Sequence, residues 1–383
     1  MDTEKTMLVA VIGMGHMGSR YAEFIAAGKV PGMKLSAVTR VHKERLEQMK
    51  NLLEGVPVYP SADDLFAAVD EGKLHIEGVI IVTPHYSHEE IAKKAFAGGL
   101  HVLCDKPAGV YSRQARNMEG AKGDDLVYGF IFHQRTFPVY KKIREFVKSG
   151  RYGGIKRINW VMSDWYRPNA YYTSGTWRAT WEGDGGGTLL NQCPHNLDLL
   201  QWICGMPART LSFCHEGKYH PIPVEDEVTS YLEWQNGATG VFIATTGEAS
   251  RINRLEISLD DALLVCDKGR LFIFELDKPE IEYREEKEDL YLKPAGTYRE
   301  IPCEEEREPY VEMLKNFAAA VLEGETPTAP GEEARKSLLL SNAMYLSAWE
   351  HRMIEIPAPG TREELEFEEA FEKGLMKKQL MRK

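Results

Sequence analysis

Several features that would assign this chain to a class of protein are missing from its sequence. No run of about 18 apolar residues occurs, so the sequence predicts no membrane-spanning helix. The formal net charge of −11 argues against nucleic acid or an anionic membrane surface as a partner. The opening residues MDTEKTMLVAVIGMG have no cationic region before the apolar run. They therefore predict a β-strand rather than a signal peptide.

Cysteine is scarce and scattered. The six cysteines stand alone, with no C-x-x-C pair and no zinc-binding spacing among them. We therefore expect free thiols in a reducing, cytoplasmic environment, and no metal site. Internal repeats and low-complexity linkers are also missing.

What remains is the composition of an ordinary globular protein. Hydrophobic residues make up 43% of the chain and charged residues 27%. A length of 383 residues predicts two or three domains.

The strongest motif lies at the N-terminus. An apolar run from Met7 to Ile12 leads directly into the sequence GMGHMG, and a helical pattern follows. Strand, G-x-G-x-x-G and helix in this order form the fingerprint of a dinucleotide-binding turn. The glycines allow a tight turn, close approach of the pyrophosphate and close packing of the helix. We expect cofactor contacts from Gly13, Gly15, His16, Met17 and Gly18.

The second strand, Lys34 to Thr39, ends without the acidic residue that usually binds the ribose 2′-hydroxyl of NAD. Thr39 and Arg40 stand there instead, and a hydroxyl beside a guanidinium suits a 2′-phosphate. Arg40 could equally be a solvated surface residue. The sequence therefore leaves NAD and NADP both open.

Strands and helices continue to alternate through residue 130. Capping boxes are predicted at residues 61–64 and 87–90, and the strand at 101–104 leads into Asp105-Lys106-Pro107. Lys106 is then either a solvated strand-end residue or a catalytic cation. Its position at the carboxyl edge of a parallel sheet, where such sheets bind ligands, favours the second. We predict a doubly wound, six-stranded Rossmann domain over residues 1–130.

The rest of the chain has a different pattern. Short strands joined by tight turns such as Asn236-Gly237 predict a large, mostly antiparallel, open sheet. We expect an α+β domain over residues 131–357, which binds substrate and mediates oligomerisation. Residues 358–383 form a charged tail that could be helical. The fold class is therefore α/β, with a Rossmann domain followed by an α+β domain.

A glycine-rich stretch, GDGGGTLLNQCPHNLDLLQWICG, begins at Gly183. The helical segment within it has an apolar stripe, and three polar side chains repeat on another face at Asn191, His195 and Asp198. Buried polar groups need partners, and a ligand is one of them. The alternative is a buried histidine bonded to a carbonyl group, beside a capping asparagine.

The loop from Trp165 to Trp181 contains six aromatic residues and two arginines. Aromatic faces with polar rims suit a sugar, whose C–H face stacks while its hydroxyls form hydrogen bonds. The alternative is an interface or a lid held down by its aromatic residues.

These motifs together resemble the glucose–fructose oxidoreductase/inositol dehydrogenase (Gfo/Idh/MocA) family. The resemblance rests on VIGMGHMG, on VIIVTPHYSHEEIAKKAFAGGLHVLCDKPAG and on GGGTLLNQCPHNLDLLQWICGMP, and it covers nearly the whole chain. It implies oxidation or reduction of sugar-like alcohols with NAD or NADP. The aromatic loop and the PVEDEVT segment around Glu225 resemble the branch that oxidises glucosides or anhydrosugars at a ring hydroxyl.

The resemblance also implies site residues. The family's EKP motif corresponds to Asp105-Lys106-Pro107, and its D-x-x-x-H pair corresponds to Asn191 and His195. Asparagine in place of aspartate leaves His195 without an anionic partner at that position. The expected cofactor contacts beyond the glycine turn are Thr39, Arg40, Thr83, Pro84, His88, Asp105 and Lys106. The expected substrate contacts are Lys106, Trp165, Arg167, Tyr172, Trp177, Arg178, Asn191 and His195.

We therefore predict an NAD(P)-dependent sugar or glycoside dehydrogenase. His195 would take the hydroxyl proton and Lys106 would stabilise the developing alkoxide, with Asn191 beside them. The two roles could be exchanged, because a desolvated lysine can also act as a base. Two alternatives stay open: a glycosidase or lyase that recycles a bound NAD, and a nicotinamide-sensing regulator without turnover.

An oligomer is the last expectation. A sheet with helices on one side leaves its other face open, and aromatic side chains on that face would mark an interface. The candidates are Trp234, Phe242, Phe272 and Phe274. We expect a homodimer or homotetramer that forms through the C-terminal sheet.

Overall fold

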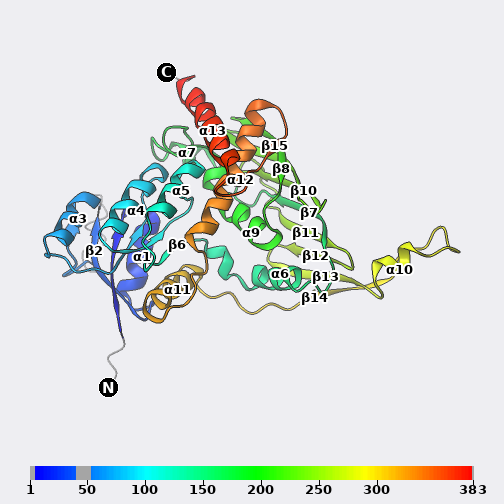
Figure 1. The fold of residues 1–383 in the computed structure, drawn as a ribbon, viewed down its shortest axis with the longest axis horizontal. Coiled ribbons are helices and arrows are strands. Elements are labelled where there is room, and N and C mark those ends of the chain that lie inside the picture. Colours follow the sequence, from blue (N-terminus) through cyan, green and yellow to red (C-terminus); the bar gives the residue numbers. More distant parts are fainter. Residues whose placement is uncertain (1–4, 40–52, 382–383) are drawn as a thin grey trace. The chain divides into compact units, whose positions relative to one another are not determined.

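The structure is a computed structural model that describes residues 5–39 and 53–381. It divides into two compact units (Figure 1). The first comprises Met1–Thr136 and Arg307–Leu338, and the second comprises Phe137–Glu306 and Leu339–Lys383. In place of the expected boundaries at residues 130 and 357, a late segment of the chain returns to the first unit. The tail 358–383 is part of the second unit.

The first unit alternates strands and helices in the expected order. Its strands are β1 (Met7–Ile12), β2 (Met33–Thr39), β3 (Val58–Tyr59), β4 (Gly78–Ile81), β5 (His101–Cys104) and β6 (Tyr128–Phe130). Its helices are α1 (His16–Ala26), α3 (Ala62–Asp70), η1 (His85–Ser87), α4 (His88–Ala97), α5 (Ser112–Ala121), η2 (His133–Thr136) and α11 (Pro309–Glu323).

The six strands form a parallel sheet in the order β3-β2-β1-β4-β5-β6. The order reverses between β1 and β4, as in a doubly wound fold, and every residue of β4 is buried. The predicted Rossmann fold is confirmed. The short strand β3, Val58–Tyr59, has only two residues and was not predicted from the sequence.

At one of the two predicted capping boxes, the N-cap serine caps its helix as expected. Ser61 accepts a hydrogen bond from the Asp64 amide at 3.1 Å, which caps α3. Ser87 has no capping bond, because its hydroxyl donates to the carbonyl oxygen of Pro84 at 2.7 Å. The prediction at Ser87 was wrong, since a turn of 3₁₀ helix precedes α4 and holds Ser87 in a helical conformation.

The late segment is joined to the first unit by buried polar contacts. The side chain of Arg135 is fully buried, donates to the Thr328 carbonyl at 3.1 Å and forms an ion pair with Glu333. The Phe130 amide donates to the Ala329 carbonyl at 2.9 Å. These bonds extend the edge of the sheet at β6.

The second unit is built around nine strands. They are β7 (Ile155–Met162), β8 (Arg209–Glu216), β9 (Glu225–Glu233), β10 (Thr239–Thr245), β11 (Asn253–Leu259), β12 (Ala262–Asp267), β13 (Arg270–Leu276), β14 (Gly296–Ile301) and β15 (Ile354–Glu355). Its helices are α6 (Pro138–Lys148), α7 (Asn169–Thr173), α8 (Thr188–Asn191), α9 (Pro194–Cys204), α10 (Glu280–Arg284) and α13 (Arg362–Leu380). Helix α12 (Gly331–Glu350) begins in the first unit and continues into the second.

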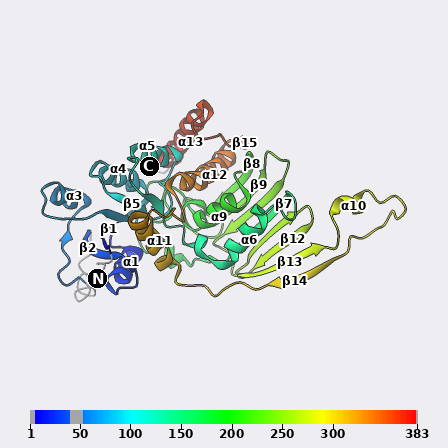
Figure 2. The same ribbon diagram turned by 60° about the horizontal axis from the view of Figure 1, so that its bottom comes forward.

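The strand order is β14-β13-β12-β11-β7-β10-β9-β8-β15, and every described pair except β7–β10 is antiparallel. Helices α6 and α9 lie against one face (Figure 2). Along β9, buried and half-buried residues alternate from Asp226 onward, as expected when one face is covered and the other open. The predicted open sheet is confirmed.

The C-terminal tail is helical. Helix α13 buries Phe367, Phe371 and Leu375 along one stripe, and the Phe371 ring stacks on Trp349 of α12 with centroids 5.3 Å apart. Among residues 5–39 and 53–381, no helix is both long and apolar enough to cross a bilayer.

Candidate active site

The glycine turn after β1 has two kinds of glycine. Gly13 has φ +100°, and a Cβ there would lie 2.6 Å from the Val82 carbonyl oxygen. A Cβ at Gly18 would collide with the carbonyl of Gly13, so the fold itself requires both glycines. A Cβ at Gly15 would meet no protein atom within 4 Å. Nothing within the described protein explains that glycine, whereas a closely approaching ligand does.

The N-terminus of α1 also fits a phosphate-binding site. It has no side-chain cap and no acidic residue in its first turn. His16 and Met17 begin the helix, with His16 exposed and Met17 half-buried. Amide groups and a partial positive charge at such an end bind phosphate groups. The turn therefore fits the pyrophosphate of a dinucleotide.

Thr39 stabilises this turn through two hydrogen bonds. Its side chain is fully buried, and its hydroxyl accepts a hydrogen bond from the Gly13 amide at 3.2 Å. Its carbonyl oxygen accepts from the Met14 amide at 3.3 Å. The structure thus gives Thr39 a role in holding the loop. Arg40, the other half of the predicted 2′-phosphate contact, lies outside the described residues.

His88 joins the loops that follow β4 and β5. Its Nδ1 lies 3.0 Å from the Pro107 carbonyl oxygen, and its Nε2 lies 2.7 Å from the Thr83 carbonyl oxygen. Burial lowers the pKa of His88 to about 4, with further lowering by the nearby His85. A neutral ring can donate to only one of the two carbonyls. His88 therefore positions the loops that contain Thr83, Pro84 and Lys106, and no solvent reaches its side chain.

Lys106 follows β5 in a loop with several perturbed groups. Its amide donates to Asp105 Oδ1 at 2.9 Å, and the Lys106–Pro107 peptide bond is cis. Burial raises the pKa of Asp105 to about 6, while the Lys106 charge opposes that shift. Burial lowers the pKa of His133 to about 3, and the charge of Lys106 adds to the lowering. Lys106 is thus a cation whose charge acts on an acidic group and a neutral imidazole in the first unit.

The triple glycine of the second unit packs against a buried carboxylate. A Cβ at Gly187 would collide with the Glu225 carbonyl, and one at Gly186 would collide with the Tyr345 hydroxyl. Glu225 accepts hydrogen bonds from the Gly187 amide at 3.0 Å, the Leu189 amide at 2.8 Å and the Tyr345 hydroxyl at 2.7 Å. Burial raises the pKa of Glu225 to about 7, although these donors favour its charged form. Glu225 thus fixes the turn that precedes α8.

The predicted single helix from the glycine turn to Cys204 is two helices. Helix α8 ends at Asn191 and α9 begins at Pro194, whose ring nitrogen has no hydrogen to donate. The Cys193 amide reaches five residues back, to the Thr188 carbonyl at 2.8 Å. The expectation of one continuous helix through Asn191 and His195 was therefore wrong.

The first turn of α9 combines buried polar side chains. His195 is 7% exposed, and Asp198 is fully buried and accepts from Gln201 Nε2 at 3.1 Å. Asn196 is also fully buried, and neither its amide oxygen nor its amide nitrogen has a hydrogen-bond partner. A buried amide without any partner in the protein normally bonds to an ordered water or a ligand.

Asn191 has an acidic neighbour that the sequence did not suggest. Its Nδ2 lies 3.2 Å from each carboxylate oxygen of Asp184. Asp184 is 1% exposed and also accepts from the Ala179 amide at 2.6 Å. The anionic group that the family motif places at position 191 has a counterpart here, one hydrogen bond away. A carboxylate embedded in G-D-G-G-G was the signal available in the sequence.

Tyr171, also missed, is the centre of the aromatic loop. The guanidinium groups of Arg167 and Arg178 lie 4.6 and 4.8 Å from its ring centroid. Its hydroxyl accepts from Arg178 at 3.0 Å and from Gln192 at 3.4 Å, and donates to Asn191 Oδ1 at 3.4 Å. These bonds join the loop to the end of α8.

The other predicted loop residues divide into two groups. Trp165 and Trp177 each lie beside an arginine, at 5.3 Å from Arg167 and 4.5 Å from Arg178 respectively. Tyr172 packs inward, and its hydroxyl lies 2.7 Å from the Thr246 hydroxyl. The exposed end of the loop thus presents tryptophans and guanidinium groups, while Tyr172 anchors it.

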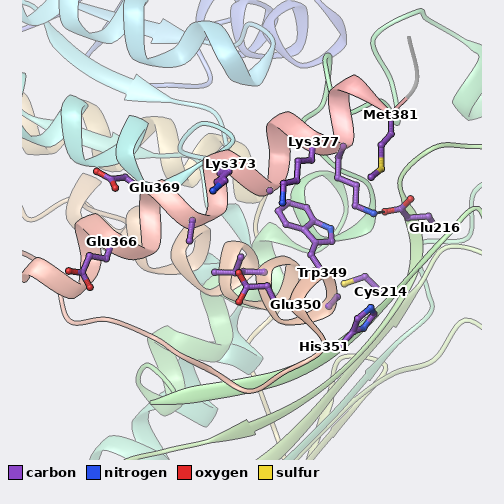
Figure 3. Close-up of a pocket in the computed structure, with 15 residues that line it drawn as sticks. Cys214, Glu216, Trp349, Glu350, His351, Glu366, Glu369, Lys373, Lys377 and Met381 are labelled. Carbon is purple, nitrogen blue, oxygen red and sulfur yellow. Dashed lines mark hydrogen bonds and ion pairs between the residues drawn. The ribbon is translucent and has the colours of Figure 1, made fainter.

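One hollow of the second unit lies away from these residues. A pocket of about 890 Å³ opens between α13, the end of α12 and the end of β8 (Figure 3). It is lined by Trp349 and by charged side chains that include the ion pair Lys378–Glu216, at 2.6 Å. None of the predicted site residues within residues 5–39 and 53–381 lines it. In the same ranges, no three His, Cys, Asp or Glu side chains converge to hold a metal ion.

Comparison with known proteins agrees with this geometry. Residues 7–122 match a family described as an oxidoreductase family with an NAD-binding Rossmann fold. Residues 140–265 match the GFO/IDH/MocA C-terminal domain. One match covers the glycine turn and Lys106, and the other covers His195 and the aromatic loop.

Similar sequences include two dehydrogenases. Myo-inositol 2-dehydrogenase of Thermotoga maritima is 24% identical over 356 residues, which is 91% of this chain and 98% of that protein. Levoglucosan dehydrogenase of Pseudarthrobacter phenanthrenivorans is 23% identical over 391 residues, with coverage of 91% and 98%.

Solved structures share the fold. The WlbA dehydrogenase of Bordetella pertussis, in complex with NADH and UDP-GlcNAcA, superimposes with a TM-score of 0.78 at 20% identity, over 93% of this chain and 99% of that one. Levoglucosan dehydrogenase in complex with NADH and levoglucosan gives 0.75 at 20% identity, over 92% and 100%. With both of its halves matched, this chain belongs to the Gfo/Idh/MocA family of NAD-binding oxidoreductases.

Proposed function

We propose that this protein oxidises a ring hydroxyl of a sugar or glycoside to a keto sugar, with NAD or NADP as the hydride acceptor. The relatives that act on inositol and levoglucosan support a cyclic polyhydroxy substrate. The exposed Trp177 and the half-buried Trp165, Arg167 and Arg178 of the aromatic loop support the same class. A ring hydroxyl within a glucoside or an anhydrosugar is the more specific form of the proposal.

The observation that carries the proposal is the orphaned amide of Asn196 beside His195. Both of its polar atoms are buried without a partner, in the first turn of α9. A polyhydroxy molecule can satisfy a donor and an acceptor at once, because each hydroxyl is both. Arg167 Nε is a second buried donor without a partner, in the aromatic loop.

Two residues have chemical roles in this proposal. His195 takes the proton of the hydroxyl, and Lys106 stabilises the negative charge that develops on its oxygen. A nicotinamide cofactor held at the glycine turn would supply the acceptor for the hydride of the ring carbon, and the products would be a ketone, a reduced cofactor and a proton. Asn191, supported by Asp184, orients the substrate beside His195.

Assembly and location are part of the proposal. We propose a homodimer or homotetramer that forms through the open face of the nine-stranded sheet. Trp234 and Phe242 are buried, but Phe272 and Phe274 are half-buried beside Tyr298, which is 58% exposed. The six free cysteines support a reducing cytoplasmic location.

The experiment follows reduced nicotinamide by absorbance, with NAD and NADP, over a panel of inositols, anhydrosugars and glycosides. Once a substrate is found, His195→Ala and Lys106→Met should each lower kcat by at least about 100-fold, the low end for loss of a positioned acid or base. Cofactor affinity should stay close to that of the native protein, because the glycine turn is untouched. Trp349→Phe, in the pocket of Figure 3, is the matched control and should leave kcat unchanged.

Two results would count against this assignment. Near-native kcat in His195→Ala would remove His195 as the base and make Lys106 the candidate. Cleavage of a glycoside without net reduction of added cofactor would identify a lyase or glycosidase that recycles its nicotinamide.

A further inference from the structure

A projecting arm distinguishes the second unit. Residues 277–295, here called the acidic arm, connect β13 to β14 and extend past the end of the sheet (Figures 1 and 2). None of these residues is buried, and α10 buries none of its own. Leu290 and Tyr291 are 86% and 88% exposed. Two adjacent apolar side chains at the end of such an arm mark a contact with another molecule.

The base of the arm is held in a defined conformation. The Glu280 amide donates to Asp261 Oδ1 at 2.7 Å, and the Glu280 carboxylate lies 3.4 Å from the Lys156 ammonium. The Tyr283 hydroxyl donates to the Ala295 carbonyl at 3.2 Å, which ties the two sides of the arm together. A flexible linker would lack such bonds. They restrict the motion of the acidic arm and hold its end away from the sheet.

The charge of the arm restricts its partner. Residues 277–295 contain seven acidic and four basic side chains, for a formal charge of −3. An anionic membrane surface or nucleic acid would repel this charge. A surface that combines apolar side chains with an unpaired cation would attract it.

The open face of the nine-stranded sheet is such a surface. Arg157 lies near its centre on β7, exposed, between Thr239 and Ser258 on the neighbouring strands. Arg157 makes no hydrogen bond or ion pair with any residue in the described ranges 5–39 and 53–381. Beside it, two cross-strand rows on β8 to β10 are mostly apolar, and Phe213 among them is 56% exposed. The rows are Leu211, Tyr231 and Val241, and Phe213, Thr229 and Ile243.

We propose that the acidic arm of one copy lies on the open face of the sheet of a second copy, with Leu290 and Tyr291 on the apolar rows and its carboxylates toward Arg157. The arm is long enough for this, because half of its residues span at most ~30 Å when extended, and an eight-residue strand such as β7 is ~26 Å long. In a two-fold dimer the contact occurs twice, once for each arm. This proposal rests on the proposed assembly through the sheet, and it identifies the acidic arm as the segment that covers the open face.

Light scattering and sedimentation of the full chain test the arm. Replacing residues 285–294 with Gly-Gly should convert the oligomer to monomer, or raise its dissociation constant at least tenfold. Leu290→Asp, Tyr291→Asp and Arg157→Glu should each weaken association by about tenfold, the effect of an interface residue of moderate importance. Leu380→Asp on α13 is the matched control, because Leu380 is also an exposed apolar residue, at 61%. Its mass should stay that of the native protein.

A disulfide test locates the contact. Tyr291→Cys and Val241→Cys proteins with different tags are mixed under mild oxidation, and a cross-linked species that contains both tags is expected. If the native protein is oligomeric but no cross-linked product forms, the placement of the arm is wrong, whereas assembly through the sheet is not contradicted. A monomeric native chain, or an arm-shortened protein of unchanged mass, would also overturn it. Sugar oxidation is measured separately, so its failure is distinguishable from failure of the arm.

Discussion

Asp184 and Asn191 show how one site can keep a negative charge although position 191 of its motif has an uncharged residue. The carboxylate stands seven residues earlier in the chain and reaches the Asn191 amide at 3.2 Å. Hydrogen bonds to a charged group are stronger than neutral ones, at about 1.5–3 kcal/mol. Asp184 therefore fixes the orientation of Asn191, and through the Tyr171 hydroxyl it also holds the aromatic loop.

Exchanging these two residues tests that relationship. Asp184→Asn should lower kcat/KM by about 10- to 100-fold, because about 1.4 kcal/mol corresponds to a factor of ten and one charge-assisted bond is lost. Asparagine keeps an oxygen that can accept from the Ala179 amide, which limits the damage to the loop. The double variant Asp184→Asn/Asn191→Asp restores the pair with its charge at position 191, and should recover part of the loss.

The pH profile of the double variant gives a second reading. A carboxylate at position 191 attracts an imidazolium, so the acid limb of kcat/KM should move to higher pH if His195 is the base. An unmoved acid limb would mean that positions 191 and 195 are not neighbours. Native kinetics in Asp184→Asn would show that the buried carboxylate has no part in the site.

At the scale of elements, two glycine-rich turns each precede a helix but have different functions. The turn at Gly185–Gly187 is filled by its own protein, since Glu225 and Tyr345 occupy the space that side chains would need. The turn before α1 is partly empty, because a Cβ at Gly15 would meet nothing within 4 Å. The turn at Gly185–Gly187 allows close packing within the protein, whereas the turn before α1 leaves room for a ligand.

Gly15→Ala separates folding from binding. We expect its melting temperature to stay close to that of the native protein, because no protein atom is displaced. Binding of NAD or NADP should weaken by about tenfold or more, since a methyl group in the path of the pyrophosphate costs about 1–3 kcal/mol. Gly120→Ala in α5 is the matched control, as its Cβ also meets nothing within 4 Å. Calorimetric titration would detect the difference, and equal affinities for both variants would contradict a phosphate site at this turn.

At the scale of the whole molecule, the two units expose their sheets differently. In the parallel sheet of the first unit every residue of β4 is buried, and two imidazole groups of this unit, on α4 and η2, are also buried. His88 and His133 have pKa values lowered to about 4 and about 3, mainly by burial. The unfolded chain binds protons at these groups below its ordinary value of 6.5, whereas the folded chain does not. Their burial therefore makes stability fall as the pH falls from 6.5 toward 4.

His88→Asn should flatten this dependence. Between pH 7 and pH 4.5, the native protein should lose about 2–3 kcal/mol more of its unfolding free energy than the variant, as expected for a shift from 6.5 to about 4. Asp105 and Glu225, with pKa values raised to about 6 and about 7, act in the opposite direction in both proteins and cancel in the comparison. Denaturant unfolding at several pH values measures the difference. Parallel pH dependences would show that His88 is not buried as a neutral group.

The sequence by itself determined the features that depend on neighbours in the chain. The glycine turn, the strands at 7–12 and 101–104, and the helix at 16–26 follow from local patterns of period 2 and 3.6 and from backbone conformations that only glycine adopts easily. The hairpin at Asn236-Gly237 is another case, where Gly237 takes a φ of +85°. The helix break at Pro194 was also readable, because proline has no amide hydrogen, but the apolar stripe obscured it.

Only the tertiary structure decided which distant groups meet. Glu225 bonds to Gly187, 38 residues away, and Tyr345 bonds to Glu225 across 120 residues. The return of residues 307–338 to the first unit depends on buried Arg135 and on bonds to the edge of β6. Local propensity contains no information about such contacts, because each is selected by burial and hydrogen bonding between segments that the folded chain brings together. For the same reason, the sequence shows that residue 184 is an aspartate but not that its carboxylate lies beside Asn191.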